Sequence, residues 1–262
     1  MTPDFSTYAA KSPFISCYMD DLILADGTRN NLAIYDDVAA DWWSDDIRWV
    51  RTLKNMVPAR LKYFEKTVSW ADKDILDVGC AGGFVAEELS KRGGRVIGID
   101  PAADAIEAAK QHAAQNALEI SYDVGIGEEL PYENNSFDHV VCVDVLEHVQ
   151  SVPQVLAEIA RVLRPDGYFL FDTINRNPIA RFATITIAED VLGLLPKGTH
   201  DPAMFIKPDE LRGKLVAAGF SPDPFKGLGL VGLNKRGDFV FGQVPLKAVI
   251  YMGVAQLTNT HD

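Results

Sequence analysis

Two acidic residues and a glycine turn in the first half of the chain have the spacing of a nucleoside-binding site. Asp77 and Gly79 end one apolar stretch, Gly83 follows four residues later, and Asp100 ends the next apolar stretch. Glycine has no Cβ, so ligand atoms can approach the main-chain N–H groups of such a turn closely. A carboxylate at the end of the second strand can accept hydrogen bonds from both hydroxyls of a ribose. The sequence therefore predicts a cofactor site formed by Asp77, Gly79, Gly83 and Asp100.

The glycine spacing separates two classes of cofactor. A dinucleotide site requires Gly-x-Gly-x-x-Gly, but Ala81 stands two residues after Gly79 and Phe84 occupies the sixth position. The motif that is present, Asp77-x-Gly79-x-x-x-Gly83, resembles the first motif of class I S-adenosylmethionine-dependent methyltransferases. A glycine turn that only packs a helix on a strand would not explain an acid on each of two strands. We therefore expect S-adenosyl-L-methionine as the cofactor, in preference to a nicotinamide or a flavin.

A second set of reactive side chains follows the fourth expected strand, residues 137–143. Asp144, Glu147 and His148 leave its carboxyl end together, and a turn would let all three converge. His148, with Glu147 beside it, can act as a general base that removes a phenolic proton near pH 7. Alternatively, the three side chains hold a divalent ion such as Mg²⁺, which orients and acidifies a catechol. A cluster that only caps the following helix is the structural alternative.

Other candidate cofactor contacts lie on either side of this motif. Arg60 precedes it, within a helix expected over residues 56–70 with Pro58 in the first turn, and could bind the methionyl carboxylate. Gly127 and Glu128 follow the third strand, where methyltransferases often contact the adenine. Many methyltransferases have an adenine-binding Asp where Ile126 stands, so Gly127 and Glu128 are expected to make this contact instead.

The elements that must position these residues alternate regularly. From residue 74 onward, apolar stretches and amphipathic stretches follow one another, which predicts an α/β fold with a doubly wound parallel sheet. We expect a Rossmann-like sheet of seven strands, closed by antiparallel strands within residues 239–256. Helical additions precede it, including an aromatic stretch from Tyr35 to Trp43 that is either an edge-covering helix or a lid over the cofactor cleft.

Composition excludes several function classes. The chain has 262 residues, a formal charge of −12 and a pI of about 4.8, without a Lys/Arg cluster, so nucleic acid is not an expected partner. Cys17, Cys80 and Cys142 lack metal-finger spacing and favour a reducing cytoplasm. Residues 1–21 do not resemble a signal peptide, and no apolar run reaches transmembrane length. We expect an arm over residues 1–30 and a methyltransferase domain over residues 31–262.

Several further motifs narrow the resemblance from the methyltransferase class to one family. They are Tyr35-Asp-Asp-Val-Ala-Ala-Asp-Trp-Trp43, Pro58-Ala-Arg-Leu61, Leu146-Glu-His-Val149, Asn175-Arg-Asn177, Leu195-Pro-Lys-Gly-Thr-His-Asp201 and Phe205-Ile-Lys-Pro208. Together they resemble the ubiquinone-biosynthesis O-methyltransferases, from about residue 34 to the C-terminus. The resemblance implies methylation of a hydroxyl on a polyprenyl catechol or hydroquinone. It also implies cofactor contacts by Arg60, Gly79, Asp100 and Val143, and magnesium dependence with Asp144, Glu147 and His148 as metal ligands.

The chain departs from this family at a few positions. Relatives usually have three glycines where Ala81-Gly82-Gly83 stands, Glu where Asp144 stands, and Met where Val143 stands. These differences leave the methyltransferase class intact. The acceptor stays open between a quinone precursor and a soluble phenol or catechol natural product, with O- or N-methylation on the same scaffold. A non-catalytic S-adenosylmethionine-binding module is a further alternative, disfavoured by intact Glu147 and His148.

Residues 177–207 form an insertion that is apolar on more than one side. One interpretation is a buried cap over the active site. The other is a peripheral membrane contact through residues 178–195 that collects a prenylated substrate. Arg176, Arg181 and Lys197 flank the segment, as expected for attraction to anionic lipids.

Overall fold

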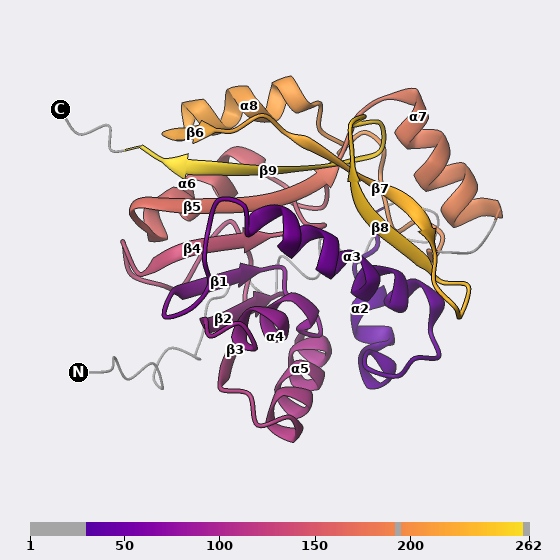
Figure 1. Cartoon of the computed structure of the whole chain (residues 1–262), viewed down its shortest axis with the longest axis horizontal. Helices are drawn as coiled ribbons and strands as arrows, with labels where there is room; N and C mark the ends of the chain where they lie inside the picture. Colours follow the sequence, from indigo (N-terminus) through magenta and orange to yellow (C-terminus); the bar gives the residue numbers. More distant parts are fainter. Residues whose placement is uncertain (1–29, 192–194, 259–262) are drawn as a thin grey trace.

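The computed structural model describes residues 30–191 and 195–258, and these form a mixed β-sheet with helices on both faces (Figure 1). Strands and helices alternate as expected, which confirms the α/β class. The strands are β1 (Asp74–Val78), β2 (Arg95–Asp100), β3 (Ile120–Val124), β4 (Phe137–Cys142), β5 (Leu163–Ile174), β6 (Phe220–Pro222), β7 (Lys226–Leu233), β8 (Phe239–Val244) and β9 (Ile250–Leu257). The longer helices are α3 (Arg48–Phe64), α4 (Phe84–Ser90), α5 (Ala103–Gln115), α6 (Val152–Val162) and α8 (Pro208–Ala217).

The strand order places β1 at the point where the chain reverses direction across the sheet. The order is β3-β2-β1-β4-β5-β9-β7-β8, with β6 beside β9, and β1 pairs in parallel with both β2 and β4. From β1 the chain moves outward through β2 and β3, then returns to β4 on the other side. Ligands of doubly wound sheets bind beyond the carboxyl ends of the strands at this point.

The sheet has nine strands in the described chain, where seven were expected. β6 and β7 both pair antiparallel with β9, at Pro222↔Ala255 and Lys226↔Met252, so together they occupy one position in the sheet. β8 pairs with β7 as a hairpin, and β8 and β9 are the antiparallel strands expected within residues 239–256. The sequence expectation missed β7 because the glycine-rich stretch 226–233 has a weak strand pattern, and it missed β6 because that strand has only three residues.

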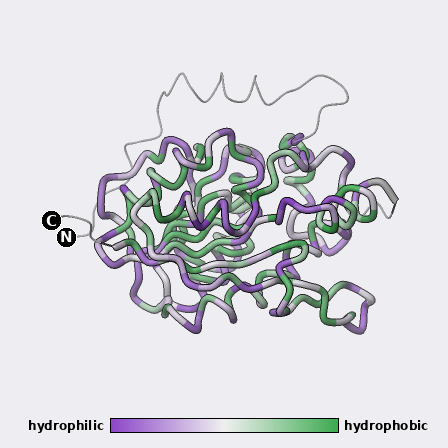
Figure 2. Tube along the Cα trace, turned by 90° about the horizontal axis from the view of Figure 1, so that it is seen from above, coloured by the Kyte–Doolittle hydropathy of each residue, from purple (hydrophilic) through white to green (hydrophobic). Residues whose placement is uncertain are grey.

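Apolar side chains that alternate along the strands fill both faces of the sheet. On β1, Ile75 belongs to a buried cluster shared with α3, α4 and α5, while Leu76 belongs to one shared with α6 and α8. Neighbouring residues of a strand point to opposite faces, so each helix layer covers its own face. Figure 2 shows the strands as mainly hydrophobic segments inside the molecule.

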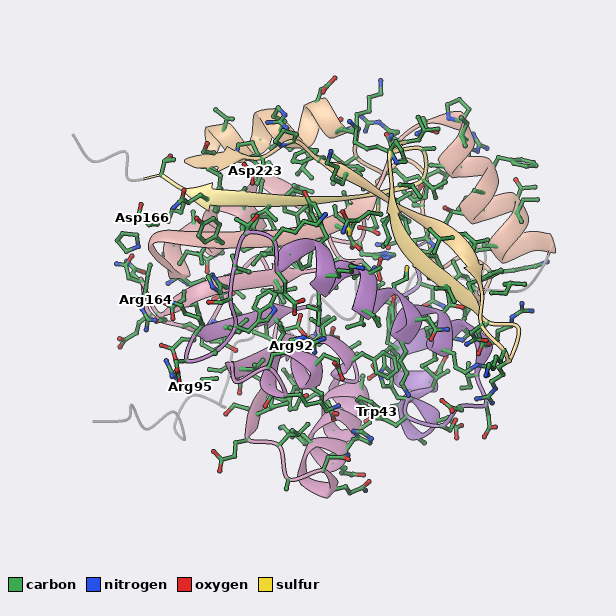
Figure 3. The ribbon with its side chains drawn as sticks, viewed as in Figure 1. Trp43, Arg92, Arg95, Arg164, Asp166 and Asp223 are labelled. Atoms are coloured by element: carbon green, nitrogen blue, oxygen red, sulfur yellow. The ribbon has the colours of Figure 1, made fainter. Side chains whose placement is uncertain are left out.

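The amino end of the sheet is fastened by ion pairs. Asp74, at the start of β1, binds Arg95 at 2.6 Å and Arg164 at 2.8 Å, and Arg164 also reaches Asp138 at 2.9 Å. Arg95 and Arg164 lie near each other at the edge of the molecule in Figure 3. These contacts join the starts of β1, β2, β4 and β5. The predicted site residues lie at the opposite, carboxyl ends of the strands.

The helices before the sheet differ from the sequence expectation. α3 begins at Arg48, eight residues before the expected start, and contains Pro58 in its interior. Pro58 is therefore not in a first turn, and Arg60 lies in the last third of the helix instead of near its start. The Tyr35–Trp43 stretch forms two short helices, α2 (Ile34–Asp37) and η1 (Ala39–Asp41).

The insertion forms α7 (Pro178–Arg181) and the π-helix η2 (Phe182–Val191). Ile185 packs with Ala180, Ile174 and Phe205 in a small buried cluster, whereas Ile179 and Phe182 are exposed. Residues 192–194 of the expected membrane contact lie outside the described residues, as does the expected arm up to residue 29. Among the helices that the structure describes, none is long and apolar enough to cross a bilayer.

Candidate active site

A pocket of about 140 Å³ opens at the carboxyl ends of β1, β2 and β4. It contains nine of the predicted site residues, namely Arg60, Asp77, Gly79, Asp100, Gly127, Glu128, Val143, Asp144 and His148. Gly83 and Glu147 do not line it. Gly83 instead starts α4 with φ +91°, and an added Cβ there would meet the Tyr122 hydroxyl at 2.5 Å.

The turn after β1 is shaped by Gly79. Its φ of +73° favours glycine, and an added Cβ would lie 2.1 Å from Val145 Cγ2. Opposite this turn, Asp100 accepts hydrogen bonds from the N–H groups of Ala81 and Ala102, both at 2.9 Å. These bonds fix the carboxylate against the turn, in the position expected for a group that accepts hydroxyls of a ribose. Burial raises the pKa of Asp100 to about 6.

Asp77 supplies a second buried carboxylate to the pocket. Both of its oxygens are buried, and neither makes a hydrogen bond of normal geometry within the described chain. Burial, followed by the nearby charge of Asp100, raises the pKa of Asp77 to about 7. Buried polar groups without partners are rare in folded proteins. The pocket thus has acceptor atoms suited to a polar or cationic ligand, which fits S-adenosylmethionine.

The expected adenine side is built by the segment after β3. Gly125, Ile126, Gly127 and Glu128 all line the pocket. The Glu128 carboxylate accepts hydrogen bonds from the N–H groups of Gln150 and Ser151, at 3.0 and 3.4 Å. Glu128 therefore links this segment to the start of α6, while the backbone of the segment faces the pocket.

Arg60 lies at the base of the pocket in a buried ion-pair network. Its Nε is 2.6 Å from Asp172 Oδ2, and its Nη2 is 2.5 Å from Asp144 Oδ2. The Asp144 N–H donates to the other oxygen of Asp172 at 2.8 Å. The sequence expectation assigned Arg60 to the methionyl carboxylate and missed Asp172, because nothing in the order of residues links α3 to β5.

Aromatic side chains from α2, η1 and the next turn cover the glycine turn. Trp42 is buried, stacks on Phe84 with 5.1 Å between ring centroids, and lies against the Gly82 backbone. The Trp43 indole N–H donates to the Gly82 carbonyl at 2.9 Å, and its ring stacks on His112 of α5 (Figure 3). Tyr35 and Trp42 line the pocket. The aromatic segment therefore walls the pocket, as the lid interpretation expects, and it packs on α4 and α5 instead of on an edge of the sheet.

Asp144, Glu147 and His148 do not converge on a common centre. Asp144 pairs with Arg60, and Glu147 accepts from the Thr173 hydroxyl at 2.7 Å. Burial, with the charges of Asp144 and Asp172 adding to it, raises the pKa of Glu147. In the described parts of the chain, no three His, Cys, Asp or Glu side chains group as a metal site. The expected magnesium set does not form a ligand group as these side chains lie, because Asp144 is paired with Arg60, although Glu147 Oε1 and His148 Nε2 have no hydrogen-bond partner among the described residues.

His148 is the member of this set that lines the pocket. Its ring is buried, and burial, followed by the nearby His200, lowers its pKa well below the usual value. Nδ1 contacts the side-chain oxygen of Asn30 at 2.5 Å, while Nε2 is buried with no hydrogen-bond partner among the described residues. An imidazole that stays neutral at pH 7 keeps a lone pair available for a proton.

The insertion supplies a second histidine beside the first. The His200 ring lies 5.0 Å from the His148 ring, and His200 Nδ1 is 3.0 Å from Glu189 Oε1 on η2. The motif that contains His200 is part of the family resemblance, but the sequence gave no signal for Glu189 or for Asn30. Asn30 contacts His148 across 118 positions, whereas Glu189 lies 11 positions before His200.

Comparisons with known proteins agree with this geometry. A family model described as a methyltransferase domain matches residues 76–171. The ubiquinone biosynthesis O-methyltransferase of Coxiella burnetii is 42% identical over 183 residues, covering 70% of this chain and 78% of that protein. Its counterpart from Marinobacter nauticus is 37% identical and covers 76% and 85%. A methyltransferase structure from Aquifex aeolicus, 16% identical, shares the fold with a TM-score of 0.60 over 85% of this chain and 98% of that one.

The pocket lies at the carboxyl ends of the strands, where the strand order reverses, and the methyltransferase-domain model matches residues 76–171. Together, these features define a class I S-adenosylmethionine-dependent methyltransferase. The identities of 37–42% are spread over most of the length of the curated relatives. The chain accordingly belongs to the family of ubiquinone biosynthesis O-methyltransferases.

Proposed function

We propose that the protein methylates a hydroxyl of a phenol or catechol, and that its acceptor is a polyprenylated quinone precursor. The observation that carries the chemistry is a buried imidazole on the wall of the cofactor pocket, His148, whose Nε2 has no hydrogen-bond partner among the described residues. The names of the relatives support the choice of acceptor. We further propose that residues 31–262 act as one methyltransferase domain, with residues 177–207 as its cap.

The cofactor supplies an electrophilic methyl group when bound. Asp100 receives the ribose hydroxyls, the Gly79 turn admits the nucleoside close to the backbone, and the segment of Gly127 and Glu128 faces the adenine. Val143 and Asp77 border the methionyl part. Arg60 offers its remaining nitrogen, Nη1, to the methionyl carboxylate, while Asp144 and Asp172 hold the guanidinium in place.

His148 accepts the proton of the acceptor hydroxyl. A phenol has a pKa near 10 in water, so most molecules are protonated at neutral pH and are weak nucleophiles. A positioned base contributes about 10²–10⁴ to the rate of such a reaction. Proton transfer to His148 would leave a phenolate oxygen, the nucleophile for the methyl group that the bound cofactor would supply. The methyl transfer itself depends on alignment and on exclusion of water.

We assign this proton transfer to His148 alone and not to a magnesium ion held with Asp144 and Glu147. The support is that Asp144 is held by Arg60 and Glu147 by Thr173. We therefore expect that addition of EDTA leaves turnover unchanged. Loss of turnover with EDTA, restored by added Mg²⁺, would contradict this assignment and support the metal interpretation instead.

The experiment that tests the function combines an acceptor panel with one substitution. A labelled methyl donor is supplied with a prenylated catechol, a matched unprenylated catechol and a primary amine. We expect label on the prenylated catechol and a loss of about 10²–10⁴ in kcat for His148→Ala, the range for a general base. Cofactor affinity should remain unchanged.

A control variant separates chemistry from folding. His139→Gln alters another buried histidine, at the amino end of β4, whose ring contacts the Ser69 carbonyl and lies outside the pocket. We expect it to retain turnover. Full activity of His148→Ala would overturn the assignment of the base. Preference for the unprenylated catechol or for the amine would replace the quinone precursor with a soluble acceptor.

A further inference from the structure

The last residue of the N-terminal segment reaches the pocket histidine across 118 positions of sequence. Asn30 is buried and makes two contacts with His148. Its amide Nδ2 donates to the His148 backbone carbonyl at 3.1 Å, and its Oδ1 lies 2.5 Å from His148 Nδ1. One side chain thus holds both the backbone and the ring of the same histidine.

These two contacts determine which ring nitrogen carries the proton. A backbone carbonyl can only accept, so the amide nitrogen of Asn30 must face it, which turns Oδ1 toward the ring. A carbonyl oxygen also only accepts, so Nδ1 of the neutral ring must be the donor. The opposite orientation of the amide would bring two oxygens together at the backbone carbonyl of His148. The neutral imidazole therefore carries its hydrogen on Nδ1 and its lone pair on Nε2.

We propose that Asn30 is a positioning residue that fixes His148 as the Nδ1–H tautomer, so that Nε2 receives the proton of the methyl acceptor. This inference rests on the proposed role of His148 as the base. Nε2 is buried and has no hydrogen-bond partner among the described residues. An incoming hydroxyl supplies the donor that this nitrogen needs, because neutral imidazole presents one donor and one acceptor.

The backbone around Asn30 is built to keep this contact. Asn30 has φ +72°, a conformation that asparagine adopts more readily than most residues. The N–H of the next residue, Asn31, donates to the Gly198 carbonyl at 3.1 Å, which ties the segment to the loop before His200. The Gly198 N–H in turn donates to Glu189 Oε2 at 3.0 Å. The placement of Asn30 is thereby linked to the segment of Glu189 and Gly198.

The tautomer can be measured directly by ¹⁵N NMR of the histidine side chains in the intact protein with S-adenosylmethionine bound. The chain has five histidines, and the His148 signals are those that disappear in His148→Gln. We expect a protonated Nδ1 and an unprotonated Nε2 in the wild-type protein. A protonated Nε2 with a bare Nδ1 would overturn the proposal, whatever the turnover of the enzyme.

Two variants connect the tautomer to turnover. Asn30→Gly removes both contacts and suits the positive φ, so it avoids backbone strain. We expect its ¹⁵N signals to show a mixture of the two tautomers and its kcat to fall about 10-fold, less than the about 10²–10⁴ of a lost base. The KM values for the cofactor and the acceptor should not change. Asn31→Ala is the matched control, because the Asn31 side chain is exposed and contacts only the Ala33 N–H among the described residues; it should keep tautomer and turnover.

The outcomes separate this inference from the proposed function. Unchanged kcat and tautomer in Asn30→Gly would overturn the positioning role, even if His148 proves to be the base. A fall in kcat with the tautomer unchanged would also overturn it, because the loss would then come from another effect of the substitution. Full activity of His148→Ala would instead contradict the assignment of His148 as the base. The ¹⁵N measurement would still determine whether Asn30 fixes the Nδ1–H tautomer of His148.

Discussion

Arg60 and Asp172 form an ion pair at 2.6 Å although 112 residues separate them, and their side chains are 3% and 0% exposed. The pair joins α3 to β5 beneath the cofactor pocket. Asp144 adds a second carboxylate to the same guanidinium. The base of the pocket therefore depends on a buried charge network, and not only on the glycine turn that the motif predicts.

Arg60→Met tests the contribution of this network to stability. Removal of the cation leaves two carboxylates close together in a buried site, and breaking a buried pair costs about 3–5 kcal/mol. Protonation of Asp172, whose pKa burial already raises, limits the loss. We expect the free energy of unfolding from urea titration to fall by about 3 kcal/mol at pH 8 and by less at pH 5. An equal loss at both pH values would contradict the role of the carboxylates.

Asp100 provides a test of cofactor binding. Asp100→Asn keeps the size of the side chain and one accepting oxygen but removes the charge. We expect S-adenosylmethionine affinity, measured by calorimetry, to fall by about 1.5–3 kcal/mol, the range for a hydrogen bond to a charged group. Unchanged affinity in a folded variant would remove Asp100 from the site.

Because the pKa values of Asp77 and Asp100 are raised, we expect the stabilisation of the protein by S-adenosylmethionine to depend on pH. Both groups have folded-state values, about 7 and about 6, above the ordinary 3.8. The folded apoprotein therefore binds more protons than the unfolded chain between about pH 4 and 7, so these groups lower its stability as the pH rises through that window. A cationic ligand favours the ionised carboxylates. The increase in melting temperature caused by S-adenosylmethionine should thus be larger at pH 8 than at pH 5, with a smaller difference in Asp100→Asn.

The position of Gly79 and Asp100 in one pocket could be predicted from sequence, because the signals for it are local. Gly79 and Asp100 each follow a strong apolar strand, and parallel strands bring their carboxyl ends to one edge of the sheet. The contacts of Arg60 with Asp172 and of His148 with Asn30 could not be predicted, since 112 and 118 positions separate the partners. Likewise, Pro58 suggested a helix start, but the tertiary packing of α3 tolerates this exposed proline in the helix interior.

Gly79→Ala tests the strained turn. The substitution places a Cβ at φ +73° and 2.1 Å from Val145 Cγ2. Left-handed backbone costs about 1–2 kcal/mol for a residue with a Cβ, and overpacking adds about 1–3 kcal/mol. We expect a large loss of stability by urea unfolding together with weaker cofactor binding. Gly213→Ala is the control: Gly213 is exposed in α8 with no atom within 4 Å of an added Cβ, so it should gain about 0.5–1 kcal/mol.

The cap carries two exposed apolar side chains that we expect to contact a membrane surface. Ile179 and Phe182, on α7 and at the start of η2, are 63% and 58% exposed, and Arg181 lies between them. Apolar side chains beside a cation favour the surface of an anionic bilayer. We expect Ile179→Ser with Phe182→Ser to reduce sedimentation with anionic liposomes and to raise KM for a prenylated acceptor presented in them. Turnover of a short soluble catechol should not change.

Val216→Ser is the matched control for the membrane experiment. Val216 is 60% exposed but lies on α8, which Figure 1 shows on the opposite side of the upper part of the molecule from α7. A general effect of surface hydrophobicity would reduce liposome binding in this variant as well, whereas a contact through the cap would not. Equal binding by the wild-type protein and the double variant would assign Ile179 and Phe182 to the cap alone. It would also favour delivery of the acceptor to the pocket from solution.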